Sequence, residues 1–310
     1  MNAWPEAVQD YIALRRSLGF KFKNAEPDLA DFSRFLNGHS ADRITVSLAL
    51  KWARGSSLTL QRSAQRLSFV RGFARHRRAI DPRTEIPPVG LLPFRPQRAR
   101  PYLYSDSEIR DLLMAALRLS LDDALRRWVF HTLYGLLAIS GMRIGEAMQL
   151  RLGDVDLKAG VLTIRGAKFG QSRLVPLHVS TKRALLAYRA RRSRYLAGRQ
   201  ASDYFFVSKR GNRLMGSEVH RVFYKLSRQI GLRGPTDSHG PRLHDFRHRF
   251  AVETLIRWYR NGVDPERRIQ VLSTYLGHIH VADTYWYLTA CPALMGSAVK
   301  RLEKRWSGLS

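Results

Sequence analysis

The chain has 310 residues, of which 45% are hydrophobic, enough for the cores of about two globular domains. Lysine and arginine number 53 against 25 acidic residues, so the formal net charge is +28 at pH 7. An excess of this size repels itself unless a polyanion lies nearby, so nucleic acid is the expected partner. The alternative is a basic surface that only faces solvent.

The sequence also argues against several classes of protein. No apolar run approaches the about 18 residues of a membrane span, and the segment Met1 to Asp10 does not read as a secretory signal. Cys291 is the only cysteine, so no intrachain disulfide can form. We therefore expect no membrane partner and a reducing, cytoplasmic setting, near the nucleoid if the partner is DNA.

Residues 1–86 predict a small, all-helical domain with a basic face. Apolar residues recur at helical spacing in four segments, and no strand pattern interrupts them. The first segment has an expected buried stripe of Tyr11, Leu14, Leu18 and Phe20. The others are Leu29 to Phe35, Val46 to Ala53 and Leu58 to Ile80. The last segment carries arginines on the side that we expect to be exposed, namely Arg62, Arg66, Arg71, Arg75, Arg77 and Arg78.

Residues 87–103 predict an extended linker between two domains. This stretch is rich in proline, which blocks helix and keeps a chain extended. It also contains Arg95, Arg98 and Arg100. The length and the arginines favour a basic linker that runs along nucleic acid over an ordinary surface loop.

Residues 104–310 predict a second domain, mainly α with a small antiparallel β-sheet, which is the α+β class. Ser105 and Glu108 form a helix-start signature, and Gly141 suits the end of a helix over about 122–139. Alternation predicts strands at 160–166 and 173–177, joined by a hairpin turn, and a third at 204–207. Periodicity predicts further helices at 181–197, 216–230, 242–258, 265–275, 281–288 and 291–306.

Two basic residues of this domain occupy positions suited to binding a phosphate. Arg143 lies at a junction between two expected helices, where a side chain and backbone N–H groups point toward one place. Lys168 lies at the tip of the expected hairpin, where it could contact a phosphate or act as a general acid. Taken alone, either residue is better interpreted as a solvated surface side chain.

His244 and Arg247 are three residues apart in an expected helix and so share one face. Both can donate hydrogen bonds to the non-bridging oxygens of a phosphoryl group. A metal site built on His244 and His248 is the rival interpretation. Asp245 stands where zinc proteases have glutamate, and Arg247 would oppose a cation, so we expect neither a metal nor a cofactor.

The segment from Leu276 to Leu288 contains His278, Tyr285 and Tyr287. The tyrosines are two apart and cannot share a helix face, so at most one can point toward His278. Packing in the core is the alternative role for either tyrosine.

Together these motifs resemble those of the tyrosine recombinases, also called phage-type integrases. The family has an arginine in a segment like Ser140 to Glu146, a lysine on a β-turn before a strand ending in V-P-L, then H-x-x-R and L-G-H. Its nucleophilic tyrosine follows the last histidine by nine residues, which selects Tyr287 and not Tyr285. The resemblance spans the whole chain, with small departures at Gly145, at Asp283 and beside Lys168. It implies a catalytic set of Arg143, Lys168, His244, Arg247, His278 and Tyr287.

The resemblance also implies a mechanism without metal or cofactor. Tyr287 would attack a DNA phosphodiester and form a 3′-phosphotyrosine, while Arg143, Arg247 and His278 would bind the phosphate oxygens. His244 would assist proton transfer.

Two further roles follow from the same resemblance. Lys168 would protonate the departing 5′-oxygen. Glu146 would orient Arg143 without reacting itself.

The implied protein is a site-specific recombinase for integration or excision of mobile DNA, borne on a transposon or plasmid. Residues 1–86 would be a SAM-like core-binding domain on double-stranded DNA. A homo-tetramer on DNA is implied, alone or with related recombinases, and the helix at 292–306 would pack on a neighbouring subunit or fold back on its own. The alternatives are a type IB topoisomerase-like relaxing enzyme and a non-catalytic DNA-binding accessory protein.

Overall fold

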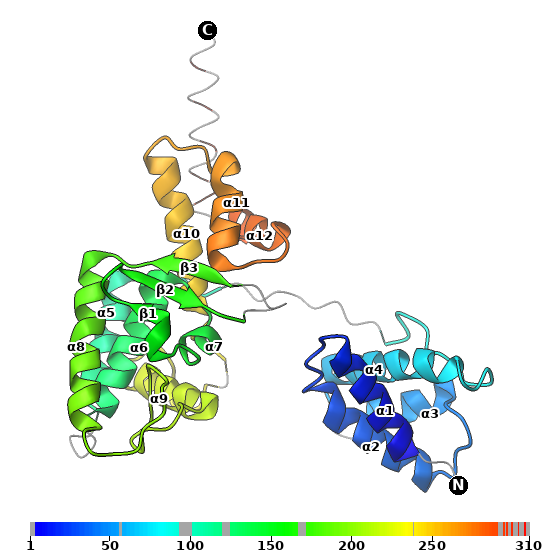
Figure 1. Cartoon of the computed structure of the whole chain (residues 1–310). Helices are drawn as coiled ribbons and strands as arrows, with labels where there is room; N and C mark the ends of the chain where they lie inside the picture. Colours follow the sequence, from blue (N-terminus) through cyan, green and yellow to red (C-terminus); the bar gives the residue numbers. More distant parts are fainter. Residues whose placement is uncertain are drawn as a thin grey trace. The chain divides into compact units, whose positions relative to one another are not determined.

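The computed structural model describes residues 4–55, 58–92, 101–119, 125–166, 172–237 and 239–290, and single positions 294, 296, 299, 303 and 307. The chain divides into two compact units, residues 1–99 and 100–310, which Figure 1 shows as separately folded bodies. The division falls inside the stretch that the sequence predicts to be a linker. Each unit is described by itself.

The first unit is a group of helices around one apolar core. Its helices are α1 (Trp4–Ser17), α2 (Ala25–Gly38), α3 (Val46–Arg54) and α4 (Leu60–Arg78). Leu29, Phe32 and Phe73 are fully buried in that core. Thr45 and Thr59 cap the starts of α3 and α4 with their side-chain oxygens, as expected for hydroxyl residues at this position.

The expected buried stripe of the first helix is wrong beyond Tyr11. Leu14 is 43% exposed, Leu18 61% and Phe20 45%, whereas the buried residues of α1 are Trp4, Val8, Tyr11 and Ile12. The helix ends at Ser17, and Gly19 has a φ of +85°, which only glycine adopts easily. Leu18 and Phe20 lie beyond the end of the helix and no longer follow its period, whereas Leu14 lies within α1 on the side away from its buried residues.

Several arginines of α4 hold the first unit together, and the prediction that all six are exposed is wrong. Arg62 pairs with Asp28 at 2.7 Å, and Arg66 pairs with Asp31 at 2.8 Å with a side chain only 12% exposed. Arg71 donates to the carbonyl oxygens of Pro87 and Pro88. The exposed members are Arg75 and Arg78.

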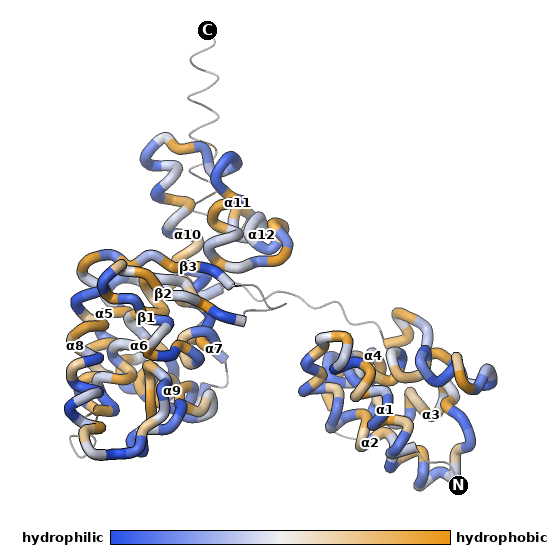
Figure 2. The backbone as a smooth tube through the Cα atoms, in the orientation of Figure 1, coloured by the Kyte–Doolittle hydropathy of each residue, from blue (hydrophilic) through white to orange (hydrophobic). Residues whose placement is uncertain are grey.

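The second unit is built around α6 (Arg126–Ser140), which is buried along most of its length. It is packed by α5 (Asp106–Leu117) and α8 (Val179–Tyr195), and the unit also contains α9 (Gly216–Gln229). The predicted capping box is present at the start of α5, where Ser105 and Glu108 bond to each other's backbone N–H groups. Along these helices, hydrophilic and hydrophobic residues are interspersed (Figure 2).

A three-stranded antiparallel sheet lies beside these helices. It consists of β1 (Val155–Asp156), β2 (Val161–Ile164) and β3 (Arg173–Pro176), in that order, with Ile164 opposite Arg173. A short 3-10 helix (Leu152–Asp154) precedes it. The two hairpin strands are confirmed, whereas the third predicted strand is wrong. Residues 204–207 form only isolated bridges, because this apolar run packs Phe205 and Phe206 into the core, and β1 takes the place in the sheet.

The last described helices form a smaller group with its own core. They are α10 (Asp245–Arg260), α11 (Pro265–Leu276) and α12 (Ala282–Ala290), and Figure 1 shows α10 extending from the main body to α11 and α12. The predicted helix at 291–306 lies almost entirely outside the described residues. The α+β class is confirmed. Within the described part, no helix has both the length and the apolar character needed to cross a bilayer.

Candidate active site

Arg143 stands at a sharp turn between two helices, as the sequence predicts. Helix α6 ends at Gly141, whose φ is +60°, and Arg143 precedes the short helix α7 (Ile144–Ala147). A Cβ atom at Gly141 would lie 2.6 Å from the Phe250 ring, so glycine also lets α10 pack closely. The turn therefore brings Arg143 next to the start of α10, where Arg247 lies.

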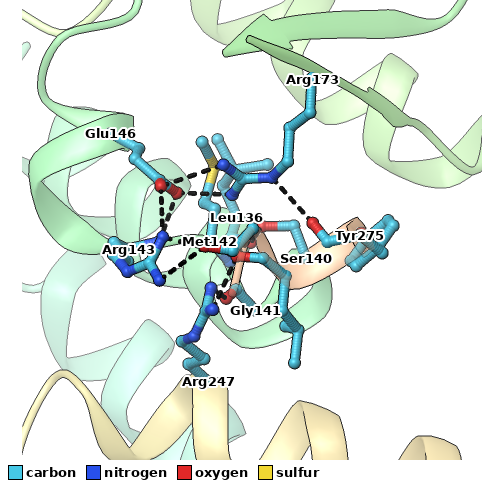
Figure 3. Close-up of polar contacts among 11 residues, drawn as sticks. Leu136, Ser140, Gly141, Met142, Arg143, Glu146, Arg173, Arg247 and Tyr275 are labelled. Carbon is cyan, nitrogen blue, oxygen red and sulfur yellow. Dashed lines mark hydrogen bonds and ion pairs between the residues drawn. The ribbon is translucent and has the colours of Figure 1, made fainter. Parts of the chain in front are cut away.

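The guanidinium groups of Arg143 and Arg247 meet at one backbone carbonyl. Arg247 Nη2 donates to the Leu276 oxygen at 2.6 Å, and Arg143 Nη1 approaches the same oxygen at 3.5 Å (Figure 3). Arg247 Nη1 also donates to Gly141 O at 3.0 Å, and Arg143 Nη2 to Gly277 O at 3.0 Å. Arg247 is 1% exposed, whereas the Arg143 side chain is 31% exposed. Two residues 104 positions apart thus present their charges at one place, open to solvent on the Arg143 side.

Glu146 lies between Arg143 and a third arginine, Arg173, which the sequence reading missed. Arg173 donates to both carboxylate oxygens of Glu146, at 3.0 and 2.7 Å, while Arg143 Nη1 donates to one of them at 2.9 Å (Figure 3). Burial alone would raise the pKa of Glu146, but the hydrogen bonds and charge of Arg173, and then Arg143, hold it below its usual value. Glu146 is therefore ionised and fixes both arginines.

Arg173 also fastens the sheet to the end of α11. Its Nε donates to Tyr275 O at 2.8 Å, and a Cβ atom at Gly277 would lie 2.8 Å from its Nη1. Gly277 has a φ of +68° and ends α11 directly before His278. Arg173 thereby helps to position the turn that carries His278. The signal in the sequence that could have indicated Arg173 is its place as the first residue of the strand after the turn that carries Lys168.

The clustered positive charge suits this place to binding an anion. Burial, and then the charge of Arg143, lower the pKa of Arg247 to about 10, so the guanidinium is still protonated at neutral pH. Among the residues that the structure describes, Glu146 supplies the carboxylate bonded to Arg143 and Arg173, and Arg247 is bonded to carbonyl oxygens. An anion bound between Arg143 and Arg247 would relieve their mutual repulsion and add charge-assisted hydrogen bonds.

The predicted histidines lie close to these arginines and are neutral at pH 7. Burial, and then the charges of Arg247 and Arg143, lower the pKa of His278 to about 3. Its Nδ1 lies 2.7 Å from the hydroxyl of Thr284, which is fully buried. When Nδ1 accepts a hydrogen bond from this hydroxyl, neutral His278 carries its proton on Nε2, and Nε2 can then donate. His244 is open to solvent on one side, yet the protein packed on its other side, followed by the charge of Arg247, lowers its pKa.

Tyr287, and not Tyr285, faces the histidines. Tyr285 is 46% exposed, whereas Tyr287 is 2% exposed and its ring lies 6.2 Å from that of His278 in a stacked arrangement. The phenol oxygen of Tyr287 lies 3.2 Å from Nδ1 of His248. The burial of the phenol and its contact with His248 were not anticipated from the sequence, which suggested His248 only as a metal ligand in the rejected alternative.

Lys168 lies outside the described residues. The strands on either side of it end at Ile164 and begin at Arg173, which are partners across the sheet.

The comparisons with known proteins agree with one another. A profile described as the phage integrase family matches residues 105–292. A protein of Sinorhizobium fredii (strain NBRC 101917 / NGR234), named "Putative integrase/recombinase y4rB", is 57% identical over 310 residues, 99% of either chain. Tyrosine recombinase XerD of Caulobacter vibrioides is 28% identical over 293 residues, covering 92% of this chain and 91% of that one.

Solved structures share the fold. The Tn1549 transposon integrase in complex with transposon right end DNA is 15% identical, covers 96% of this chain and 98% of its own, and gives a TM-score of 0.65. The XerH site-specific recombinase bound to palindromic difH substrate is 19% identical. The match covers 90% of this chain and 78% of the XerH chain, with a TM-score of 0.63. With the profile over more than half of its length and a 57% identical relative of equal extent, the chain belongs to the phage integrase family, the tyrosine recombinases.

Proposed function

We propose that this site-specific recombinase cuts and rejoins DNA through a covalent 3′-phosphotyrosine at Tyr287. The observation that carries the proposal is the meeting of Arg143 and Arg247 at the Leu276 carbonyl, next to the turn that bears His278. This arrangement suits one phosphodiester, because two guanidinium groups held in place can bind its two non-bridging oxygens. Tyr287, packed against His278, supplies the nucleophile.

The arginines are proposed to act by stabilising the charge that grows on the phosphate during the reaction. Both are already fixed by backbone carbonyls, and Arg143 also by Glu146, so little reorganisation is needed when DNA arrives. Preorganised donors of this kind typically contribute about 3–4 kcal/mol each to the stability of a transition state. His278 is proposed to donate a further hydrogen bond to the same phosphate through Nε2.

The strand exchange conserves phosphodiester bonds. The phenol oxygen of Tyr287 forms a bond to phosphorus, and the bond from phosphorus to the 5′-oxygen breaks. Lys168 is proposed to give a proton to this 5′-oxygen, which leaves as a hydroxyl. A 5′-hydroxyl of another strand then reverses the steps, so no nucleotide cofactor is required.

The DNA contacts and the assembly are part of the same proposal. The exposed Arg75 and Arg78 of α4 suit binding of the DNA backbone by the helical unit, and the basic stretch 87–103 suits a linker that follows the duplex. Exchange between two duplexes needs four strand cuts, which suits a homo-tetramer on DNA. The similar Tn1549 transposon integrase is solved in complex with transposon right end DNA, which suits integration or excision of mobile DNA as the task of this chain.

The direct test is covalent trapping on nicked duplexes, in which the short leaving strand diffuses away after cleavage. Because the DNA site is unknown, a library of nicked duplexes with random cores would be incubated with the protein and the protein-linked DNA recovered. Wild type and Tyr285→Phe are expected to trap DNA, and Tyr287→Phe is expected to trap none. Trapping by Tyr287→Phe, or no trapping by any form, would refute the proposal.

A plasmid that carries two recovered sites would then separate recombination from the topoisomerase-like alternative. Crossover products are expected from wild type. Relaxation of supercoils without crossover products would favour the relaxing enzyme instead.

A further inference from the structure

His248 lies one turn after His244 on the same face of α10. It is four residues after His244, so these two side chains are neighbours on the helix, and it directly follows Arg247 in the chain. The rings of His244 and His248 are perpendicular, with centroids 4.7 Å apart. His248 is therefore the next residue inward along the face that carries the proposed catalytic groups.

The phenol of Tyr287 forms a hydrogen bond with His248. The distance from the phenol oxygen to Nδ1 is 3.2 Å, and the two rings meet edge to face at 5.5 Å. Trp286 packs against the same histidine at 5.4 Å, which restricts the rotation of its ring. His244, by contrast, is open to solvent. The contact that a proton-accepting group needs is thus present at His248.

His248 has a free lone pair at neutral pH. Burial, and then His244, lower its pKa to about 4, with smaller lowering by Arg242 and Arg247 and an opposing effect of Asp245. From α12 it faces the uncharged rings of Trp286 and Tyr287. Neutral His248 with its proton on Nε2 can accept the hydroxyl hydrogen of Tyr287 at Nδ1.

The approach of DNA would make His248 a better base. General bases work best when their pKa lies near the working pH, and a pKa of about 4 is low for this task. A phosphate bound by Arg143 and Arg247 brings negative charge next to the histidine and cancels the charge of Arg247. Both effects stabilise an imidazolium, so the basicity of His248 rises when the substrate is in place.

We propose that His248, rather than His244, is the general base that takes the proton of Tyr287 during cleavage. The inference rests on the proposed function, in which Tyr287 is the nucleophile. The phenol proton moves to Nδ1 of His248 as the phenol oxygen bonds to phosphorus and the 5′-oxygen leaves with a proton from Lys168. On rejoining, the 5′-hydroxyl attacks phosphorus and gives its proton back to the neutral Lys168, while the imidazolium of His248 returns its proton to the departing phenol oxygen.

The test compares His248→Asn with His244→Gln on a nicked duplex that wild type cleaves. Asparagine keeps an acceptor near the position of Nδ1 but cannot take up a proton. We expect cleavage by His248→Asn to be slower by about 100-fold, within the usual range for loss of a general base, with unchanged DNA binding. A rate near that of wild type would refute the role of His248.

A more acidic nucleophile separates a base from a group that only positions the phenol. Difluorotyrosine at position 287 ionises more readily than tyrosine and depends less on a base. It is expected to restore cleavage at least tenfold in His248→Asn, but not in His244→Gln or Arg247→Lys. Rescue of His244→Gln instead would assign the base to His244, and rescue of neither would leave His248 without a proton-transfer role. Failure of wild type to form any adduct at Tyr287 would instead refute the proposed function.

A measurement on the unmodified protein guards against a variant that fails to fold. Vanadate can link Tyr287 to the ends of cut DNA and imitate the phosphate during transfer. In that complex, nitrogen NMR of labelled histidines is expected to show His248 protonated at both ring nitrogens. Protonation of His244 with His248 still neutral would overturn the assignment.

Discussion

The two halves of the candidate site are held in different ways. The phosphate half is braced by charged hydrogen bonds: Arg173 grips Glu146 with two bonds, and Arg247 is anchored to two carbonyl oxygens. The nucleophile half depends on ring packing and a 3.2 Å bond from the Tyr287 hydroxyl to His248. The phosphate half is therefore held by charge-assisted hydrogen bonds, whereas the nucleophile is held by ring packing and a neutral hydrogen bond, which is the weaker kind.

The largest effect is expected in the phosphate half. Arg247→Ala removes a buried guanidinium that binds two carbonyls and, in our proposal, a phosphate oxygen. Single-turnover cleavage of the nicked duplex should fall by about 100- to 1000-fold, as for loss of one preorganised donor. Arg257→Ala, an exposed arginine of the same helix, is the matched control and should cleave normally. Equal cleavage rates for the two variants would contradict a role for Arg247 in binding the phosphate.

The next largest effect is expected for Glu146, the carboxylate that binds Arg173 and Arg143. Glu146→Gln leaves Arg173, whose side chain is 11% exposed, without its carboxylate, and loss of one partner of such a buried pair costs up to about 3–5 kcal/mol. We expect a lower urea midpoint and at least about tenfold slower cleavage, because Arg143 also loses an anchor. Adding Arg173→Met should recover part of the stability but not the cleavage rate. Full recovery of both would show that Glu146 has no positioning role.

A smaller effect is expected in the pH dependence of stability, through the buried histidines. In the folded chain the pKa of His248 is about 4 and that of His278 about 3, both below the ordinary 6.5. The unfolded chain therefore binds protons first as the pH falls, so the free energy of unfolding should decrease from pH 6.5 toward pH 4 and be insensitive to these two groups above pH 6.5. His278→Asn should flatten this slope in urea titrations, and His280→Gln, at an exposed neighbour, should not. The same slope in both variants would contradict a contribution of His278 to the pH dependence of stability.

The smallest effect is expected for the partner of His278. Thr284→Val keeps the shape of a fully buried side chain but removes the hydroxyl that lies 2.7 Å from Nδ1 of His278. One neutral hydrogen bond is worth about 1 kcal/mol, which corresponds to a rate about fivefold slower. Cleavage kinetics with matched thermal melts would measure it. A loss as large as that of Arg247→Ala would mean that the two halves are more tightly coupled than their contacts suggest.

Much of the fold was predictable from local pattern. Periodicity placed most helices within a few residues, and the capping box at Ser105 and the hairpin strands were correct. Errors arose where local pattern is ambiguous. The apolar run at 204–207 has the pattern of a strand, but its phenylalanines are core residues. In the first helix, Leu14 lies on the exposed side, and Leu18 and Phe20 lie beyond the helix end at Ser17. The domain boundaries at 86 and 103 stay predictions.

The order of the motifs indicated the family, but the contacts within the site could not be read from the sequence. Arg173 reaches Glu146 across 27 positions, and His248 reaches Tyr287 across 39. Helical spacing carries no information about such long-range pairs, which depend on how α7, β3, α10 and α12 pack. The spacing of His248 from His244 is evident in the sequence. The role that we propose for His248 depends on its contact with Tyr287, which only the structure shows.

The most direct test of the central claim is to map the residue that becomes linked to DNA. Trapped complexes would be digested with protease and nuclease, and the cross-linked peptide sequenced by mass spectrometry. We predict a single adduct on Tyr287, joined to a 3′-phosphate, with a free 5′-hydroxyl on the released strand. An adduct on Tyr285 or another residue, or a link to a 5′-phosphate, would contradict it.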